Sequence, residues 1–480
     1  MLKYGKGVHS VYDMPHSFQH KNLGGVTITE AQREVSVIRD TDVIVVGGGP
    51  GGTAAAVTAA RNGARTVLLE RYGHLGGMAT GGLVNIIPNL ADIYGHQWIG
   101  GFCQEFITRL KKRGAADFPA PEAWGKHDPA LVEKYDKASM GHFYLRQNPD
   151  DERVVLYSAV IDPEVGKDEL CTMAEEAGVE LLLHTWVVEP IVDNGRVCGV
   201  IVENKAGRQA LLGKVVIDST GDGDLLMNVP TETVDYMRPG SRIAQFGFVF
   251  WIAGVDLDAY DAFAAEHPEE LKAAKQKITE GGGRPMFCRG LLEHQHGVVW
   301  VHRLIGSLHQ TEPEEMTFID TSARLFAVHS WELMKENLPG FENSFIMLSA
   351  PQLGTSGGRR IIGRYYLTDK DMDRDEPFED TIAIFADNDR GDGSLEHPRT
   401  FVPYRALLPR DVEGLLVACR AFSADYEFSE YFNLIPHCMC FGQAAGAAAA
   451  IAVKTGCSLS DVPYDELKAV LLEGGAILPD

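Results

Sequence analysis

The stretch "DVIVVGGGPGGTAAAVTAARNGARTVLLE", residues 42–70, constrains the fold more than any other part of the sequence. Residues 42–46 form a short apolar, β-branched run, which is typical of a buried parallel strand. The glycines that follow have the spacing G-x-G-x-x-G and are Gly47, Gly49 and Gly52. This spacing allows a tight turn, the approach of a pyrophosphate and close packing of the next helix. We expect a Rossmann-like unit whose helix, over 51–62, follows Pro50 and points its N-terminus at phosphates.

An acidic residue stands at the end of the next predicted strand, 66–69. Glu70 lies 23 residues after Gly47, close to the ~20 at which an acid holds the ribose hydroxyls of a dinucleotide. A carboxylate there favours FAD or NAD over NADP. A lone glycine motif is weak evidence, but a strand, glycines, a helix and an acid in this order are specific. The alternative is a glycine-rich turn in an unrelated α/β unit.

A second glycine pair separates FAD from NAD. The stretch "ERYGHLGGMATGGLV" resembles the ERxxxLGGxxT segment of flavoproteins, in which the chain continues along the pyrophosphate toward the isoalloxazine ring. The resemblance assigns to the cofactor Arg71, Gly76, Gly77, Met78, Ala79 and Thr80. His74 in this stretch is interpreted as a loop histidine rather than as a covalent flavin link.

An α/β rhythm resumes from residue 153. A helix is predicted over 162–177, and four strand runs follow, separated by turns at Asn194-Gly195 and Ala206-Gly207. The last strand, 215–217, ends in "DSTGDGD". In flavoproteins of this pattern, the position of Val187 lies against adenine, and the turn after the last strand lies beneath the cofactor. This places Thr220, Gly221 and Asp222 at the cofactor.

The ordered set of motifs carries a family resemblance. With "VVIDSTGDGDL", "GGRRIIGRYYLT", "VPYRALLP", "LLVACRAFSA" and "PHCMCFGQAAG", the stretches above run in order over residues 40–456. The chain resembles the FAD-dependent oxidoreductases of the glutathione-reductase-like two-domain superfamily. The resemblance implies an α/β fold: a Rossmann-like FAD-binding domain, made of a parallel sheet with a β-meander, and an inserted mixed-sheet α+β substrate domain. It says little about the substrate.

The expected organisation is discontinuous in the sequence. The expected parts are an N-terminal arm (1–37), the FAD-binding domain (38–230, with an insertion at 88–150), the substrate domain (231–400), a return segment with the flavin helix (401–460) and a tail (461–480).

The segment "NLIPHCMCFGQAAGAAAAIAVKTG", residues 433–456, predicts a helix of small residues after a proline. The resemblance implies that this helix points its N-terminus at the pyrimidine edge of the flavin, where its dipole stabilises negative charge. It assigns to the cofactor Gly442, Gln443, Ala444 and, from "LLVACRAFSA", Arg420. The alternative is an alanine-rich core helix that contacts no ligand.

Candidate catalytic residues are fewer and rest on weaker patterns. At a helix N-terminus the pKa of His437 should fall, so that a neutral imidazole serves as a base while hydride goes to flavin. Its alternative role is to cap the helix. Arg360 would bind an anionic or carbonyl group of the substrate, or form a structural salt bridge. Asn433 and Tyr431 are candidate helpers.

Composition excludes several classes of protein. The balance of 44 basic and 67 acidic residues gives a net charge of −23, so binding to nucleic acid is not expected. The most apolar run, 444–453, is about half of the ~20 residues that a membrane span needs. Without an apolar signal core at the N-terminus, a cytoplasmic location is expected. No metal is expected, since the eight cysteines lack a metal-type spacing and the loop with Asp387, Asp389 and Asp392 departs from calcium-loop spacing.

These patterns leave three functional hypotheses. The first is an oxidase or dehydrogenase that moves hydride from a CH–OH or CH–CH group of a small organic substrate to flavin N5. The second is an ene-type reductase fed by an external donor, and the third is a non-catalytic FAD-binding subunit. The absence of a second G-x-G-x-x-G argues against an NAD(P)H domain. The sequence does not decide whether the electron acceptor is oxygen, a quinone or a carrier protein. It also does not decide whether the protein forms a homo-oligomer.

Overall fold

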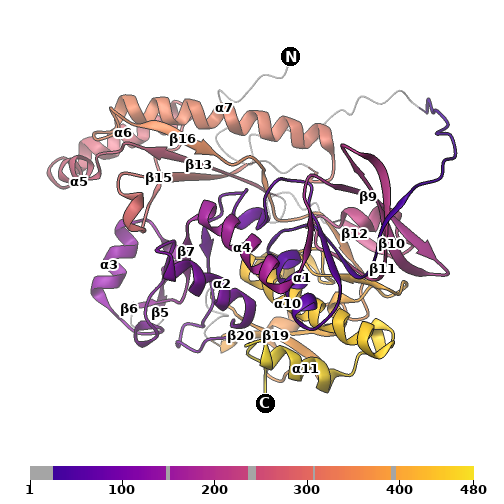
Figure 1. Cartoon of the computed structure of the whole chain (residues 1–480). Helices are drawn as coiled ribbons and strands as arrows, with labels where there is room; N and C mark the ends of the chain where they lie inside the picture. Colours follow the sequence, from indigo (N-terminus) through magenta and orange to yellow (C-terminus); the bar gives the residue numbers. More distant parts are fainter. Residues whose placement is uncertain (1–24, 148–151, 236–244, 306–308, 391–395) are drawn as a thin grey trace.

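The computed structural model describes residues 25–147, 152–235, 245–305, 309–390 and 396–480. Two β-sheets organise the chain, one near each end of the molecule (Figure 1). The N-terminal residues expected to form part of an arm, 1–24, lie outside the described residues.

The first sheet contains the predicted dinucleotide-binding unit. Its strand order is β8-β2-β1-β11-β10-β9, with β21 paired to β11. The strands are β1 (Val37–Val46), β2 (Thr66–Leu69), β8 (Glu180–Leu182), β9 (Trp186–Asp193), β10 (Arg196–Asn204), β11 (Gly207–Asp218) and β21 (Leu415–Val417). The pairs of β1 with β2 and β11 are parallel, whereas β10 pairs antiparallel with β9 and β11. The predicted parallel sheet with a β-meander is therefore confirmed.

The two faces of this sheet are covered differently because side chains alternate along a strand. Val43 and Val45 pack with the helices α1 (Pro50–Arg61), α4 (Pro163–Ala177) and α10 (Ile435–Thr455). Ile44 and Val46 pack with residues of the meander and of the segment 412–421. Both faces of the strand are thus apolar, as its sequence predicts.

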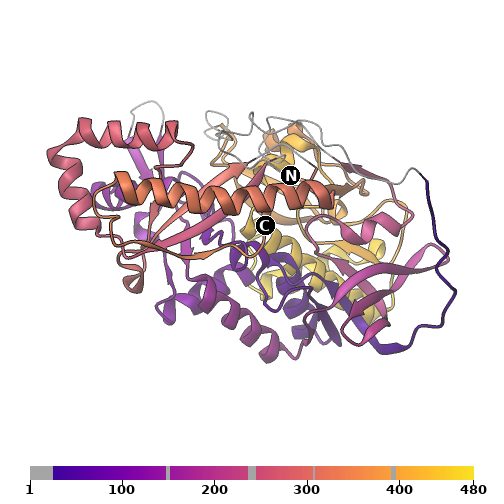
Figure 2. The ribbon, with the colours of Figure 1, turned by 90° about the horizontal axis from the view of Figure 1, so that it is seen from above.

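The second sheet has the order β14-β15-β13-β16, with β17 paired to β13. These strands are β13 (Phe246–Ala253), β14 (Cys288–Arg289), β15 (Val299–Ile305), β16 (Phe345–Ser349) and β17 (Gly354–Thr355). The long helix α7 (Pro313–Asn337) runs along this sheet, with α5 (Leu257–Glu266) and α6 (Pro268–Glu280) at one end (Figure 2). Every strand pair in this sheet is antiparallel, so the mixed sheet expected for the 231–400 part of the chain is not found here, whereas the sheet and its separate helices have the expected α+β character.

Shorter elements complete the two bodies. Further helices in the described part of the chain are α2 (Gly101–Lys112), α3 (Pro129–Lys137), α9 (Tyr426–Tyr431) and α11 (Tyr464–Glu473). The remaining strands are β3 (Ile86–Ile87), β4 (Ala116–Asp117), β5 (Tyr144–Gln147), β6 (Glu152–Val155), β7 (Ala159–Ile161), β12 (Thr233–Asp235), β18 (Arg359–Ile361), β19 (Thr381–Ala386) and β20 (Arg399–Pro403).

Two segments pack in a different core from the one expected from their place in the sequence. Phe378 and Phe385, the latter on β19, belong to the core that contains α1 and α10, although the expected substrate domain extends to residue 400. Conversely, Tyr135 and Phe143 of the 88–150 insertion pack against the second sheet. In both segments the apolar residues are buried, but no local sequence pattern indicates in which of the two cores they lie.

The small residues of α10 allow it to lie directly on α1. A Cβ added to Gly442 would be 1.9 Å from the carbonyl oxygen of Gly51, and one added to Gly446 would be 2.2 Å from that of Ala55. Because a larger residue has no room, glycine is required at both positions. By length and hydropathy α10 also passes as a membrane span within the described chain, but 94% of its apolar window is buried inside the protein.

Candidate functional site

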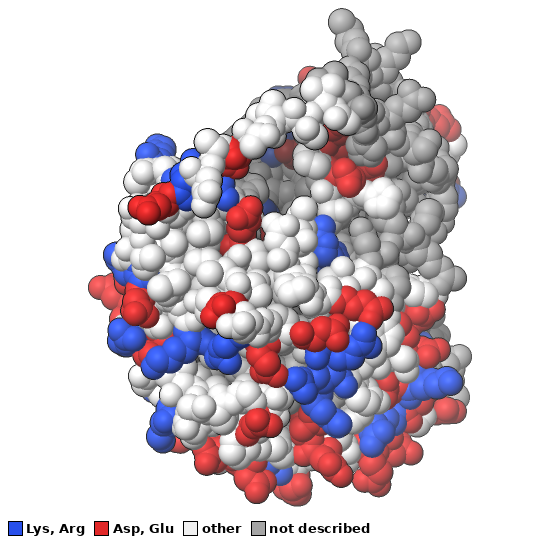
Figure 3. Space-filling model, turned by 90° about the vertical axis from the view of Figure 1, so that its right-hand side faces the viewer, with Lys and Arg blue, Asp and Glu red and all other residues white. Residues whose placement is uncertain are grey.

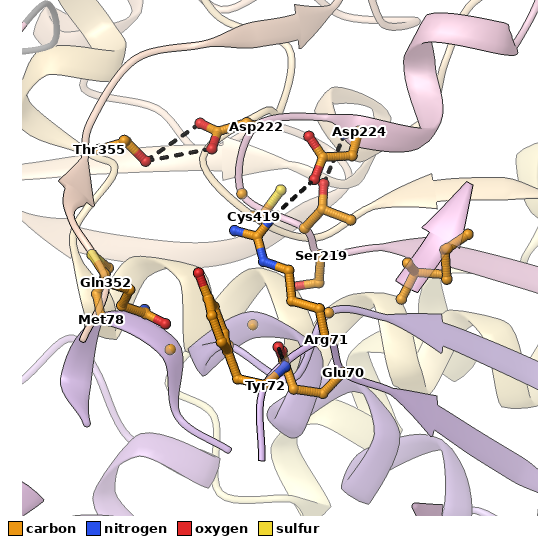
Figure 4. A pocket seen from close by; sticks show the side chains of 18 of the residues that line it. Glu70, Arg71, Tyr72, Met78, Ser219, Asp222, Asp224, Gln352, Thr355 and Cys419 are labelled. Carbon is orange, nitrogen blue, oxygen red and sulfur yellow. Dashed lines mark hydrogen bonds and ion pairs between the residues drawn. The ribbon is translucent and has the colours of Figure 1, made fainter. Parts of the chain in front are cut away.

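A cavity opens at the carboxyl ends of β1, β2 and β11 (Figure 4). This edge of a parallel sheet is where ligands of doubly wound folds bind. The wall is built by the segments 46–51, 69–72, 77–78, 185–187, 219–225, 352–355 and 419–420 together with Met316 and Cys438. On the molecular face in Figure 3, acidic and basic side chains are interspersed.

The glycine motif forms one wall of the cavity. Gly47 has a φ of +95°, and a Cβ there would be 2.5 Å from the carbonyl oxygen of Ser219. A Cβ on Gly52 would be 1.7 Å from the carbonyl oxygen of Gly47, so this glycine lets the helix pack on the turn, behind the cavity. Nothing lies within 4 Å of a Cβ on Gly49, and α1 starts there without a side-chain cap. Free N–H groups beside open space fit a pyrophosphate.

Glu70 joins two parts of the cavity wall. Its Oε2 accepts a hydrogen bond from the N–H of Gly48 at 2.6 Å, and its Oε1 accepts one from the N–H of Tyr72 at 2.8 Å. The side chain is buried but borders the cavity. The carboxylate therefore fixes the glycine turn and the loop after β2 relative to each other beside the cavity.

A partly buried ion pair forms another part of the cavity wall. Arg420 donates to Asp222 Oδ1 at 2.6 Å and also to the hydroxyl of Thr355, which belongs to the second sheet. Asp224, two residues on, has its pKa raised by burial and by the charge of Asp222. The side chains of Arg420 and Asp222 thus link the FAD-binding body to the substrate domain at the cavity.

Acids near the cavity do not form a metal site in the part of the chain that the structure describes. No group of three or more His, Cys, Asp or Glu residues is placed to hold a metal ion there. Asp218 instead accepts hydrogen bonds from the N–H and hydroxyl of Thr220, as a turn residue does, and burial raises its pKa to about 6. Asp392, considered for a calcium loop, lies outside the described residues.

The structure corrects the expected position of His437. Its side chain is fully buried, and its ring lies 4.2 Å from that of Phe385, in the apolar core rather than in the cavity wall. Nδ1 accepts a hydrogen bond from the N–H of Leu434 at 3.2 Å. The histidine therefore caps the first turn of α10, which was the alternative to a catalytic base.

The other catalytic candidates also lie behind the wall. Arg360 is 1% exposed, and both it and Asn433 donate to the carbonyl oxygen of Ser356, at 3.4 and 3.0 Å. Tyr431 is partly buried and packs on Phe432. Arg360 and Asn433 support the segment next to Thr355, and none of the three side chains lines the cavity.

The cofactor candidates divide into two groups. Those that line the cavity are Gly47, Gly49, Pro50, Glu70, Arg71, Gly77, Met78, Val187, Thr220, Gly221, Asp222 and Arg420. Those that do not are Gly52, Gly76, Ala79, Thr80, Gly442, Gln443 and Ala444. The last three face other helices and loops: Gln443 accepts from the N–H of Phe102 and donates to the carbonyl of Gly474, each at 3.0 Å.

Sequence reasoning missed several lining residues. Four of them adjoin a motif residue or lie inside a motif, so their sequence neighbours could have indicated that they line the cavity. They are Trp186, Tyr72, Cys419 and Cys438. Gln352 carried no such signal, because the β16–β17 loop reaches the cavity only through the pairing of β17 with β13.

Comparisons with known proteins agree with this geometry. A family model described as FAD dependent oxidoreductase matches residues 42–471. The digeranylgeranylglycerophospholipid reductase of Methanocella arvoryzae is 29% identical over 180 residues, which is 38% of this chain and 39% of that protein. The thiamine thiazole synthase of Aeropyrum pernix is 32% identical over 162 residues, 34% of this chain and 43% of that protein. The chain thus spans less than half of either relative.

Among solved structures, p-nitrophenol 4-monooxygenase from Pseudomonas putida is 13% identical with a TM-score of 0.46, covering 92% of this chain and 87% of that one. A geranylgeranyl bacteriochlorophyll reductase-like protein from Thermoplasma acidophilum is 13% identical with a TM-score of 0.41, covering 90% and 82%. The family match over most of the sequence leads to one conclusion: the chain belongs to the FAD-dependent oxidoreductases and uses FAD as its cofactor.

Proposed function

We propose that this chain is an FAD-dependent reductase that saturates a carbon–carbon double bond of a small organic substrate, with electrons from an external donor. The observation that carries the proposal is the chemistry of the described lining residues where α10 begins. Cys438 and Cys419 border the cavity there, and its lining also includes apolar Met78 and Leu353. This wall offers groups that hold a proton and apolar surface for a carbon skeleton.

Both thiols remain protonated at neutral pH. Enclosure in the cavity wall raises the pKa of Cys438 to about 11, and burial raises that of Cys419 further. Bound FAD supplies hydride exchange with carbon. Reducing a double bond needs, besides hydride, one proton at the neighbouring carbon. The Cys438 thiol, which donates to the carbonyl oxygen of Asn433 at 3.7 Å, is the group that we expect to deliver it.

Oxidation of a CH–OH group, an alternative from the sequence, needs a base instead. The acids in the described wall already have partners. Glu70 accepts hydrogen bonds from two backbone N–H groups. Asp222 pairs with Arg420, and Asp224 lies 3.6 Å from Arg71. The imidazole of His437 lies in the core. The reductase named among the curated relatives supports the same direction of reaction.

Anaerobic reoxidation tests the proposal. The purified flavoprotein is reduced by light and mixed with isoprenoid alkenes, with α,β-unsaturated carbonyl compounds or with oxygen, while flavin absorbance is recorded. We expect reoxidation by one of the unsaturated compounds with a saturated product in equal amount. Fast reoxidation by oxygen alone, with peroxide released, would assign an oxidase, and no reoxidation by any of them would favour a non-catalytic subunit.

The role of Cys438 is tested separately. We expect Cys438→Ala to slow double-bond reduction by about 10²–10⁴-fold, the usual contribution of a positioned proton donor, while flavin content is kept. Cys438→Ser should restore part of the rate, because a hydroxyl also carries a proton. Cys457→Ala, at a partly exposed thiol outside the cavity lining, is the matched control. Full activity of Cys438→Ala would remove the thiol from the reaction.

A further inference from the structure

A half-buried arginine of the substrate domain has no acid to balance its charge. Arg284 precedes β14, and its backbone N–H and carbonyl are both bound to the hydroxyl of Ser330, at 2.8 and 3.3 Å. The Nε of its guanidinium is buried without a hydrogen-bond partner, and among the described residues no carboxylate forms an ion pair with it. Taking a cation out of water is costly unless an anion pairs with it. Stability alone therefore gives no reason for an arginine at this position.

The sheet of the substrate domain places another unpaired donor near Arg284. Residues directly opposite each other on antiparallel strands point to one face of a sheet. One such row crosses β14, β15 and β13 and consists of Cys288, Trp300 and Trp251. The thiol of Cys288 donates to the carbonyl oxygen of Ser139 at 3.4 Å, so the row faces the segment after α3, whereas α7 runs along the other face (Figure 1). The Nε1 of Trp251 is buried on this face and has no acceptor among the described residues.

The next row on this face contains a histidine. Two residues along the strands, His302 of β15 is opposite Val249 of β13. Solvent reaches its imidazole, yet desolvation, followed by the charges of Arg284 and His142, lowers its pKa to about 4. The charge of Arg284 also acts on the thiol of Cys288 in the first row, so the guanidinium lies close to both rows. Cationic groups and N–H donors thus gather here, and no described carboxylate is among the charges that act on them.

The same face of the sheet leads to the cofactor cavity. Beyond the row of His302, the next row pairs Gly247 of β13 with Gly354 of β17. A Cβ added to Gly354 would be 3.4 Å from the Sδ of Met78, which lines the cavity. Because each residue of a strand advances about 3.4 Å, the row of His302 is about 7 Å from this contact. The buried side chain of Val249 makes the surface between them apolar.

We propose that Arg284 and His302 bind an anionic oxygen group, a carboxylate or a phosphate, at one end of the substrate, whose carbon chain extends over Val249 to the cofactor cavity beside Met78. A guanidinium donates from Nε and Nη in a planar fork that matches the oxygens of such a group. The reacting carbons are then separated from the anionic group by several carbon atoms. The reaction at those carbons rests on the proposed function, whereas binding of the anion does not.

The unpaired charge predicts that Arg284 serves binding at the expense of stability. Arg284→Met removes the charge and keeps much of the volume, so we expect the melting temperature to stay the same or to rise. Arg289→Met is the matched control on the adjacent strand. The guanidinium of Arg289 donates to both carboxylate oxygens of Asp261, at 2.6 and 2.9 Å, so its loss should lower the melting temperature and leave ligand binding unchanged.

The binding test uses three saturated eight-carbon compounds on the flavin-loaded protein: octanoate, octyl phosphate and octanol. Affinity is measured by calorimetry, and the change in flavin absorbance reports whether the chain reaches the cavity. We expect one of the two anions to bind at least tenfold more tightly than octanol, and the tighter of them identifies the group. Arg284→Met should weaken that anion about 10- to 100-fold, the scale of hydrogen bonds to a charged group, and leave octanol unchanged. Arg284→Lys should recover part of the loss.

Three results would overturn the proposal. They are equal affinity for the three compounds, undiminished binding of the anion by Arg284→Met, and a melting temperature of Arg284→Met as low as that of Arg289→Met. Because the compounds are saturated, failure of the proposed double-bond reduction leaves this test intact. Conversely, reduction of an uncharged isoprenoid alkene by a protein that binds neither anion would keep the proposed function and refute this inference.

Discussion

Replacing Gly442 by alanine should separate the two helices that carry the cofactor cradle. The added Cβ would be 1.9 Å from the carbonyl oxygen of Gly51, where ordinary contacts begin at 3.4 Å. Helix α10 would have to retreat by about 1 Å or more, at the cost of about 1–3 kcal/mol typical of an overpacked core. The better helix propensity of alanine returns only about 1 kcal/mol.

The displacement should appear in the cofactor as well as in stability. Gly51 is in the first turn of α1, so its movement disturbs the N–H groups that face the phosphates. We expect Gly442→Ala to release flavin at a lower temperature than the native protein, measured by the rise in flavin fluorescence on heating. Gly446→Ala, at 2.2 Å from Ala55, should behave alike.

Gly141 provides the matched control. It has ordinary φ, and nothing lies within 4 Å of an added Cβ, so Gly141→Ala should leave the release temperature within error. If Gly442→Ala retained flavin as well as this control does, the argument from helix contact would be refuted.

Three further substitutions test other parts of the site. Arg420→Ala leaves the partly buried carboxylate of Asp222 without its cation, so the free energy of unfolding should fall in denaturant titrations and FAD should bind more weakly. Burial raises the pKa of Asp218 to about 6, above that of the unfolded chain, so its ionisation opposes folding. The contribution of Asp218 to stability should therefore fall by about 3 kcal/mol as the pH rises from 4 through 6. The difference in stability between the native protein and Asp218→Asn should follow that fall, and a difference that does not change with pH would contradict it. His437→Ala should lower the melting temperature, because it leaves a cavity in the core that costs about 2–4 kcal/mol. The reaction rate per bound flavin and its pH profile should not change. A shifted pH profile would indicate that the imidazole does act as a base.

The sequence predicted the cofactor domain well because its signals are local. The strand before Gly47, the helix after it and the acid Glu70 follow from backbone and charge requirements of a bound dinucleotide, and the structure has each in place. The meander was equally readable from its turns at Asn194-Gly195 and at Gly207.

The face of a helix that meets the cavity was less predictable. Cys438 and His437 are adjacent in α10, yet one borders the cavity and the other lies in the core against Phe385. Rotation of a helix about its axis is set by its neighbours, and here Gly442 and Gly446 turn the small-residue face toward α1. The position of Gln352 could not be predicted either, because its loop reaches the cavity through the pairing of β17 with β13, two strands about 100 residues apart in the sequence.

The contact between α1 and α10 also dictates when the protein can acquire its cofactor. These helices come from opposite ends of the described chain. The glycine turn and α1 therefore gain their contact with α10 only after residue 446 has left the ribosome. At about 5–20 residues per second, synthesis holds the first strand and helix without their partner for tens of seconds. Flavin loading is therefore a late event, and a nascent chain that stops before α10 should emerge colourless.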